Sequence, residues 1–345
     1  MRTDKTACQD EAKLGVVGRR RPILSPGLVP ALGVLGATAA LAVGVKLLNP
    51  SFGSLDQLTA ILVTAIFLIV ASFGQGLVIL IGGIDLSIGV VMGIGGMIIA
   101  GLTRGSNDAL FYALPAALLG CGAIGLVNGI GVAVAKLPPF IMTLSSGTTF
   151  FGVALGLTAG SSQQPVAPAL QHFMSGRWLG LPLPILFTVA FVLVAVVFQN
   201  RTAEGRKLYA LGSSPAAAQV LGLPITALTI AVYTISGLCA GIAGVLLAGY
   251  SASATLDMGN ALLMPTIAAV VIGGARVTGG SGLYLGTLAG ALFLSTLSTV
   301  ITAFSLSQGF RSVVQGAVIL AALLLQSPQS RLRKPWATRG ERQVN

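Results

Sequence analysis

Residues 57–89 read QLTAILVTAIFLIVASFGQGLVILIGGIDLSIG, and no other segment says more about the architecture of this chain. The stretch holds a single charged side chain, Asp85, and its first apolar run is longer than the about 20 residues that cross a membrane as a helix. Gly82 and Gly83 interrupt the run, and a second apolar segment follows. The pattern predicts two membrane-spanning helices joined by a tight, glycine-rich connection.

The composition of the whole chain agrees with a membrane protein. Its 345 residues are 54% hydrophobic and only 8% charged, whereas soluble domains carry about 25% charged residues. A surface so poor in charge has to be covered by lipid. The formal net charge is +11, but the basic residues lie between apolar runs without interleaved aromatic side chains, so we expect no nucleic-acid partner.

The same apolar density recurs along the chain and predicts an all-α polytopic membrane protein. About ten transmembrane helices are expected, some of them broken by glycine or proline; eight or nine also fit the pattern. The run 261–277 is short and holds Pro265, which allows a re-entrant or broken helix. The ten predicted spans cover residues 27–48, 57–81, 86–104, 109–135, 140–160, 181–199, 226–250, 261–277, 282–304 and 311–326.

The distribution of Lys and Arg orients these spans. With ten spans, 16 of the 20 basic residues fall on the side of the N-terminus, and four fall on the other side: Lys46, Arg104, Arg177 and Arg311. Because cytoplasmic loops are enriched in Lys and Arg, both termini are expected in the cytoplasm.

This orientation divides the chain into three parts. A basic cytoplasmic tail (1–26) precedes a transmembrane domain (27–326), and a second basic cytoplasmic tail (327–345) follows it. Within the domain, a polar cytoplasmic loop is expected at about 200–225 and an external loop at about 161–180.

The sequence offers no energy source and no catalytic centre. A P-loop ends in Gly-Lys-Ser/Thr, and the chain contains no Gly-Lys pair. The only histidine, His172, falls in the predicted external loop, and Cys8, Cys121 and Cys239 lack metal-binding spacing. We therefore expect no enzyme activity, no catalytic residue, no metal and no cofactor.

Several polar residues inside apolar runs are candidates for a translocation path or gate. Asp85 and Ser87 follow the Gly82-Gly83 break, where they either cap the next helix or form a gate. Asn128 lies beside the Gly125–Gly129 pair and either bonds across a helix contact or lines the path.

The segment Lys136 to Leu144 adds two further candidates. Pro138 and Pro139 predict an extended corner, and it is followed by the hydroxyl groups of Thr143, Ser145, Ser146, Thr148 and Thr149. These hydroxyls either bond back to their own helix or line a path for a polyhydroxylated solute.

The predicted cytoplasmic loop contains a helix signature. Ser214 is a plausible N-cap and Pro215 a favoured first helical residue, so a short helix is expected from about 215 to 221. Gly222 would close this helix, and Ala216, Ala217 and Ala218 would give it a small-residue face that a separate motor subunit could grip. The alternative is a solvated connector.

Paired glycines recur near the C-terminal end of the predicted domain and predict a tight turn between two apolar segments. The glycines expected to serve structure are Gly82, Gly83, Gly89, Gly273, Gly274, Gly279 and Gly280.

Taken together and in this order, these segments resemble the ribose/xylose-type permease subunits of bacterial ABC sugar importers. The resemblance covers about residues 49–326. The motifs that carry it are NPSF (49–52), GGIDLSIG (82–89), LPPFIMTL (137–144), GRKLYALG (205–212) and AAVVIGGARVTGGSGLYLGT (268–287).

The resemblance implies a working assembly in the bacterial inner membrane. In that family the permease forms a pair, either of identical copies or of close paralogues. The pair docks on two ATPase subunits, which bind the ATP, and receives its solute from a periplasmic binding protein. The expected solute is a monosaccharide such as ribose or xylose; a nucleoside, a branched-chain amino acid or a furanose signal is the alternative.

This sequence also departs from the family's motifs at three places. The family's coupling segment E-A-A-x-x-x-G falls on Ala216, Ala217, Ala218 and Gly222, so alanine replaces its glutamate. Leu262 to Pro265 stand where many members carry acidic residues. Gly279 to Gly282 lack the arginine of the family's GGRGS.

Overall fold

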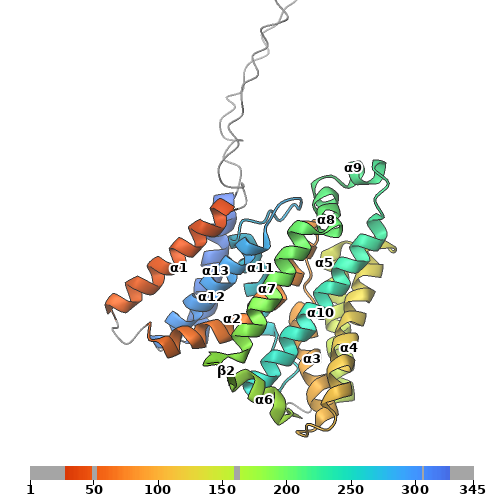
Figure 1. Cartoon of the computed structure of the whole chain (residues 1–345). Helices are drawn as coiled ribbons and strands as arrows, with labels where there is room; N and C mark the ends of the chain where they lie inside the picture. The colour runs from red at the N-terminus through yellow and green to blue at the C-terminus, as the bar shows by residue number, and fades with distance from the viewer. Residues whose placement is uncertain (1–27, 49–52, 159–163, 305–306, 327–345) are drawn as a thin grey trace, which may run out of the picture.

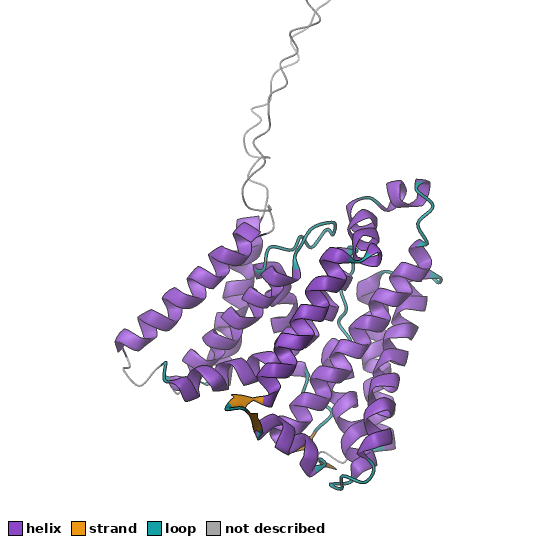
Figure 2. Cartoon of the chain, in the orientation of Figure 1, coloured by secondary structure: helices purple, strands orange, loops and turns teal. Residues whose placement is uncertain are grey.

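The computed structural model describes residues 28–48, 53–158, 164–304 and 307–326 as a bundle of helices (Figures 1 and 2). The two predicted tails and the NPSF motif lie outside the described residues. All ten segments expected to be membrane helices are helical in the bundle: α1 (Leu28–Leu48), α2 (Leu55–Leu80), α3 (Ile88–Thr103), α4 (Leu110–Ala133), α5 (Pro139–Leu157), α7 (Leu183–Arg201), α10 (Ile225–Ser251), α11 (Asn260–Ile272), α12 (Tyr284–Ala303) and α13 (Gln308–Gln326).

Seven helices of the described residues are long and apolar enough to cross a membrane: α1, α2, α4, α5, α7, α10 and α12. Helices α3 and α11 are apolar but have only 16 and 13 residues. Pro265 lies inside α11 without ending it. The structure therefore confirms a multi-span helical protein, and the number of crossings stays a prediction.

Local sequence signals set several helix ends. The hydroxyl of Ser54 accepts a hydrogen bond from the Gln57 N–H at 3.2 Å and caps α2. Pro139 is the first residue of α5, as expected after the Pro-Pro corner. Arg104 ends α3 in a left-handed conformation, with φ of 46°.

Short elements fill the two loops that were predicted at about 161–180 and 200–225. The loop near 161–180 holds α6 (Pro168–Ser175) and the hairpin of β2 (Arg177–Trp178) with β3 (Leu181–Pro182). Its strand β1 (Gln164–Pro165) pairs with β4 (Ser253–Ala254). The loop near 200–225 holds α9 (Pro215–Val220), close to its predicted bounds, and also α8 (Ala203–Ser213), which the sequence analysis did not anticipate.

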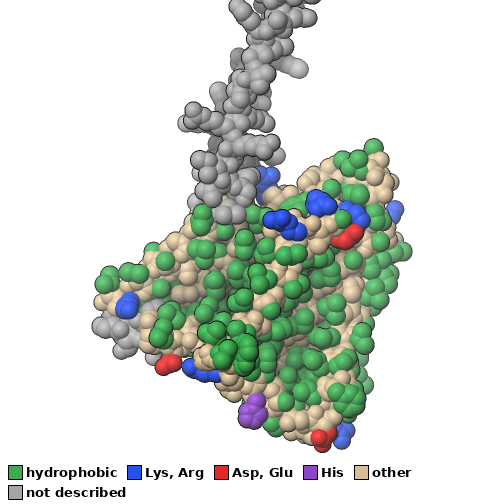
Figure 3. All heavy atoms as spheres, viewed as in Figure 1, with side chains coloured by type: hydrophobic (Ala, Val, Ile, Leu, Met, Phe, Trp, Pro, Cys, Tyr) green, Lys and Arg blue, Asp and Glu red, His purple; other side chains and the backbone are tan. Residues whose placement is uncertain are grey.

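Helix α10 is the centre of the bundle and packs against α2, α3 and α4. Its contact with α4 depends on the Gly125–Gly129 pair: a methyl group at Gly125 would lie 2.3 Å from the Tyr233 carbonyl oxygen, and one at Gly129 would lie 2.7 Å from the Cα of Ile230. The two backbones approach closely for this reason. Helices α1, α5 and α7 bury few of their residues inside the bundle, and Figure 3 shows hydrophobic side chains over the middle of the molecule.

The two ends of the bundle differ. Figure 1 places α8 and α9 at one end, together with the first turns of α1, and α6 at the opposite end. Basic side chains gather around α8 in Figure 3. Those of the described residues that belong to this end are Lys136, Arg201, Arg206, Lys207 and Arg276.

Candidate functional site

A buried polar network lies where the chain leaves α2 and enters α3. Gly82, with φ of +84°, turns the backbone after α2, and Asp85 follows with 1% of its surface exposed. One carboxylate oxygen accepts hydrogen bonds from the Ser87 N–H at 2.9 Å and the Ser87 hydroxyl at 2.6 Å. The other accepts from the Ser236 hydroxyl of α10 at 2.8 Å.

The network continues from Ser87 to α4 and α5. The Asn128 amide donates to the Ser87 hydroxyl oxygen at 2.9 Å, and the Asn128 carbonyl oxygen accepts from the hydroxyl of Ser146. Thr143 of α5 accepts from the Leu86 N–H at 3.0 Å. Side chains of α4, α5 and α10 thus hold the connection between α2 and α3 in one conformation.

The electrostatics of the network rest on hydrogen bonds. Asp85 makes no ion pair within the described ranges, so three donors from hydroxyl and backbone groups take the place of a cation. A carboxylate buried in this way is costly unless such donors are present. The hydroxyl of Tyr233 lies close by, 2.5 Å from where a methyl group on Gly83 would be. It is buried and, like the Gln75 side chain, has no hydrogen-bond partner among the described residues.

The structure brings together four of the five predicted path residues: Asp85, Ser87, Asn128 and Thr143. Ser145 does not join them, because it lies on the exposed face of α5. Ser146 belongs to the hydroxyl-rich stretch noted after the Pro-Pro corner, but it was not selected as a path residue, although it lies three residues after Thr143 on the same helix face. The sequence analysis missed one member, Ser236. Ser236 carried no signal, since only the fold brings it to Asp85.

A second candidate region is the α8–α9 end. The Ser214 hydroxyl accepts from the Ala217 N–H at 3.2 Å and caps α9, as predicted. Pro215, Ala216 and Ala217 are exposed, whereas Ala218 is buried and faces the bundle. Gly222 follows the helix with φ of +68°. Helix α9 therefore presents a short, uncharged surface that ends in the exposed side chains of Val220 and Leu221.

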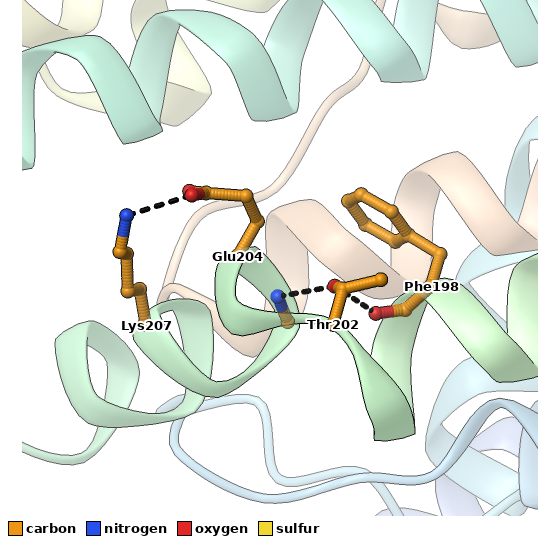
Figure 4. A network of polar contacts seen from close by, with 5 residues as sticks. Phe198, Thr202, Glu204 and Lys207 are labelled. Carbon is orange, nitrogen blue, oxygen red and sulfur yellow. Dashed lines mark hydrogen bonds and ion pairs between the residues drawn. The ribbon is translucent and has the colours of Figure 1, made fainter.

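Helix α8 is capped at its start by Thr202 (Figure 4). The Thr202 hydroxyl accepts from the Gly205 N–H at 3.1 Å and donates to the Phe198 carbonyl oxygen of α7 at 2.5 Å. Lys207 and Glu204 form an ion pair at 2.7 Å on its outer face. The chain thus turns from α7 into α8 at a fixed angle.

Helix α8 is also fastened to the bundle. The Tyr209 hydroxyl donates to the Gly282 carbonyl oxygen at 2.6 Å, and burial raises the pKa of Tyr209 to about 12, so this donor keeps its proton at neutral pH. A methyl group at Gly212 would lie 1.9 Å from the Leu80 carbonyl oxygen at the end of α2. That same carbonyl accepts from the Gly280 N–H at 2.9 Å. A displacement of α8 would therefore also displace the end of α2, because the two are in direct contact at Gly212 and Leu80.

The predicted structural glycines fall into two groups. A left-handed conformation, with φ between +75° and +92°, is adopted by Gly82, Gly274, Gly279 and Gly280. Close approach of backbone accounts for Gly89 and Gly273, where a methyl group at Gly273 would lie 2.3 Å from the Gly286 carbonyl carbon, and close approach of the Tyr233 hydroxyl accounts for Gly83. Within the described residues, no cluster of His, Cys, Asp and Glu could hold a metal ion.

The fold is that of a multi-span helical membrane protein, and comparison with known proteins gives the family. A family model described as the branched-chain amino acid transport system / permease component matches residues 57–323, and the chain belongs to this family. It is accordingly a multi-pass protein of the inner membrane.

Relatives agree with the resemblance to ribose-type permeases. The ribose import permease protein of Bacillus subtilis (strain 168) is 34% identical over 310 residues, which cover 88% of this chain and 95% of the relative. The D-allose transport system permease protein of Escherichia coli (strain K12) is 30% identical over 274 residues, covering 79% and 84%. The autoinducer 2 import system permease protein of Photorhabdus laumondii is 30% identical over 257 residues, covering 73% and 77%. No solved structure matches the chain.

Proposed function

We propose that this chain is the membrane-spanning subunit of an ATP-driven importer for a monosaccharide. The observation that carries the proposal is the 34% identity with a ribose import permease over 88% of the chain. The solute path would be built from the polar residues of the bundle, because the described helices otherwise present mostly apolar side chains.

The proposed orientation puts the α8–α9 end in the cytoplasm. It rests on the basic side chains at that end (Figure 3) and on the tendency of cytoplasmic segments to carry Lys and Arg. Ten crossings would then bring both termini to the cytoplasmic side. The opposite end, with α6 and the short strands, would face the periplasm and meet a solute-binding protein.

Energy would come from a separate ATPase that binds the ATP. We propose that α9 enters a groove of that ATPase with Pro215, Ala216 and Ala217, while Ala218 anchors the helix to the bundle. No residue from Pro215 to Val220 is charged, so shape rather than charge would drive docking. Through Tyr209 and Gly212, α8 would pass the motion of the ATPase to the end of α2.

The polar network around Asp85 would serve as a gate beside the path. Its position supports this role, since it joins the α2–α3 connection to three other helices. Its complete hydrogen bonding equally supports a purely structural role. Ser145 would reach the path only if a second permease copy, identical or paralogous, packs on the exposed face of α5.

Transport by the reconstituted assembly tests the proposal. The chain would be co-purified with the ATPase and the solute-binding protein encoded beside it, placed in liposomes and supplied with ATP and labelled solutes. We expect ATP-dependent uptake of one sugar among D-ribose, D-xylose and D-allose. Uptake of leucine or a nucleoside without uptake of any sugar would replace the monosaccharide by the alternative class of solute.

A further inference from the structure

The bundle contains a cavity of about 480 Å³ that is separate from the Asp85 network. It lies between α2, α11, α12 and α13, with one contribution from α10. Small-molecule sites have volumes of about 300–1,000 Å³, so this cavity, called the outer cavity below, can hold a solute of monosaccharide size together with water.

The polar side chains of the outer cavity gather on one face of α12. Ser295, Ser298, Thr299 and Thr302 all line it, and their spacing of three and four residues places them on one side of the helix. The Thr299 hydroxyl donates to the Ser295 carbonyl oxygen at 3.0 Å, which leaves lone pairs of its oxygen to accept other hydrogen bonds.

An amide from a neighbouring helix completes this surface. The Gln315 side chain of α13 donates to the Ser298 hydroxyl oxygen at 3.1 Å, and an amide has a second N–H and a carbonyl oxygen to offer. Thr64 and Phe67 line the cavity from α2. Hydroxyl and amide groups beside an aromatic side chain suit a molecule with many hydroxyl groups and an apolar ring face.

The lining of the outer cavity also indicates whether a charged solute could bind there. None of the 15 described side chains that line it is ionisable. From these side chains an amino acid would receive no counter-charge in return for the water lost around its ammonium and carboxylate, which is expensive. A neutral polyol meets no such penalty, so the outer cavity fits a sugar and disfavours a zwitterion.

The outer cavity lies in the half of the bundle remote from α8. Its lining residues on α2 are Ala60 to Leu68, in the half of the helix away from Leu80, which contacts Gly212 of α8. Those on α12 are Leu294 to Thr302, away from Tyr284 and the Gly282 carbonyl that binds Tyr209. With α8 on the cytoplasmic side, the cavity belongs to the outer half of the bundle.

We propose that the outer cavity is a binding site for one neutral monosaccharide inside a single permease copy, between the binding protein and the Asp85 network. This inference rests on the proposed function. It assigns the first contact of the solute with the membrane subunit to Ser295, Ser298, Thr299 and Gln315.

Filling the cavity is the first test. Ser298→Phe should reduce sugar uptake by the reconstituted assembly at least tenfold. Its matched control is Thr188→Phe, which places the same side chain in an apolar groove between α7, α2 and α12 and should keep uptake within twofold of wild type. Uptake by Ser298→Phe within twofold of wild type would overturn the proposal.

Chemical labelling gives a second readout that does not need ATP or a fully active variant. In a chain whose three cysteines are replaced by alanine, Ser298→Cys should react with a small water-soluble methanethiosulfonate. High concentrations of D-ribose or D-allose should slow this reaction severalfold, while leucine should not. Ser175→Cys, exposed on α6, should react at the same rate with or without sugar.

The two tests separate the outer cavity from the proposed function. Failure of the wild-type assembly to import any sugar would refute the proposed function. Intact sugar import by the wild type, combined with no protection of Ser298→Cys by D-ribose, D-xylose or D-allose, would refute only the outer cavity as a sugar site.

Discussion

Asp85 is buried, and its carboxylate has three hydrogen-bond donors but no cation among the described residues. Donors on Ser87 and Ser236 belong to segments that are far apart in the chain. The carboxylate therefore fixes the α2–α3 connection against α10. Removing it leaves these donors unpaired, and each costs about 1–3 kcal/mol when buried.

Replacing Asp85 should impair both stability and transport. We expect Asp85→Ala to lower the unfolding temperature of the detergent-solubilised chain and to reduce uptake at least tenfold, because the hydroxyl of Ser236 and the amide of Ser87 lose their acceptor. A thermal unfolding assay and the liposome uptake assay measure the two effects.

Asp108→Ala is the matched control, since Asp108 is exposed and its carboxylate bonds, among the residues that the structure describes, only to nearby Ser106. Surface changes of this kind shift stability by about 0.5 kcal/mol or less. If both variants unfold and transport like the wild type, Asp85 is neither a gate nor a necessary structural anchor.

Tyr209 offers a prediction with a pH signature. The phenol donates to Gly282 only while it is protonated, and its pKa is raised to about 12 by burial. Tyr209→Phe should destabilise the chain by about 1 kcal/mol, the usual net value of one hydrogen bond. Because a raised pKa favours the protonated folded form, the difference from wild type should be constant below pH 10 and shrink between pH 10 and about 12.

Chemical unfolding at several pH values measures this difference. Leu208→Ile is a useful comparison, because it changes the shape of a buried side chain of α8 without a titratable group. A difference between Tyr209→Phe and wild type that vanishes already near pH 8 would show that the phenol is not held in its buried position.

At the scale of elements, α9 is the part of the bundle most clearly shaped for a partner. It is six residues long, uncharged and capped by Ser214, and Val220 and Leu221 expose 89% and 71% of their surfaces. Apolar side chains at such exposure beyond the apolar middle of the bundle are consistent with contact to another protein.

Added bulk on α9 should uncouple the transporter. Ala217 is exposed in the isolated chain, so Ala217→Trp should fold normally but obstruct a groove on the ATPase. We expect the ATPase activity stimulated by the loaded binding protein to fall at least fivefold, together with uptake. Measurement of ATP hydrolysis in the reconstituted assembly decides this.

Arg206→Ala is the control on the neighbouring helix. Arg206 bonds only to the Arg201 carbonyl oxygen at 3.2 Å within the described chain, and exposed charges contribute about 0–1 kcal/mol to contacts. Full stimulation in Ala217→Trp would place the docking surface elsewhere than on α9.

For the whole molecule, the decisive property is its orientation in the membrane. Gln219 is exposed on α9 and Ser175 is exposed on α6, at the opposite end. In right-side-out vesicles carrying a chain without Cys8, a membrane-impermeant maleimide should label Ser175→Cys directly. It should label Gln219→Cys only after permeabilisation. The reverse pattern would invert the orientation derived from the basic residues.

Much of the architecture could be predicted from the sequence, because a helix that crosses the lipid bilayer needs a run of about 20 apolar residues. Apolar length located all ten helical segments, and the Ser214-Pro215 signature located α9 within a residue. The GxxxG pair at Gly125 and Gly129 correctly indicated a close helix contact. These features depend on neighbouring residues alone, which is why the sequence sufficed.

The remaining features depend on distant parts of the chain. Ser236 joins the Asp85 network from 151 residues away, and no local pattern distinguishes it from other serines in apolar helices. Helix α8 was missed because its polar sequence has no apolar run, and its packing depends on Gly212 meeting the end of α2. Ser145 and Ser146 are neighbours in the sequence, but the turn of α5 exposes Ser145 and buries Ser146 in the Asp85 network.

The hydrogen bond between Asp85 and Ser236 has a consequence for biosynthesis. The ribosome adds Ser236 151 residues after Asp85, and at roughly 5–20 residues per second this takes about 8–30 seconds. During that interval the nascent α2 and α3 can be held by Ser87, Asn128 and Ser146 but not by α10. Until α10 emerges, the Asp85 carboxylate lacks one of its three hydrogen-bond donors, and the packing of α2, α3 and α4 around α10 can begin only then.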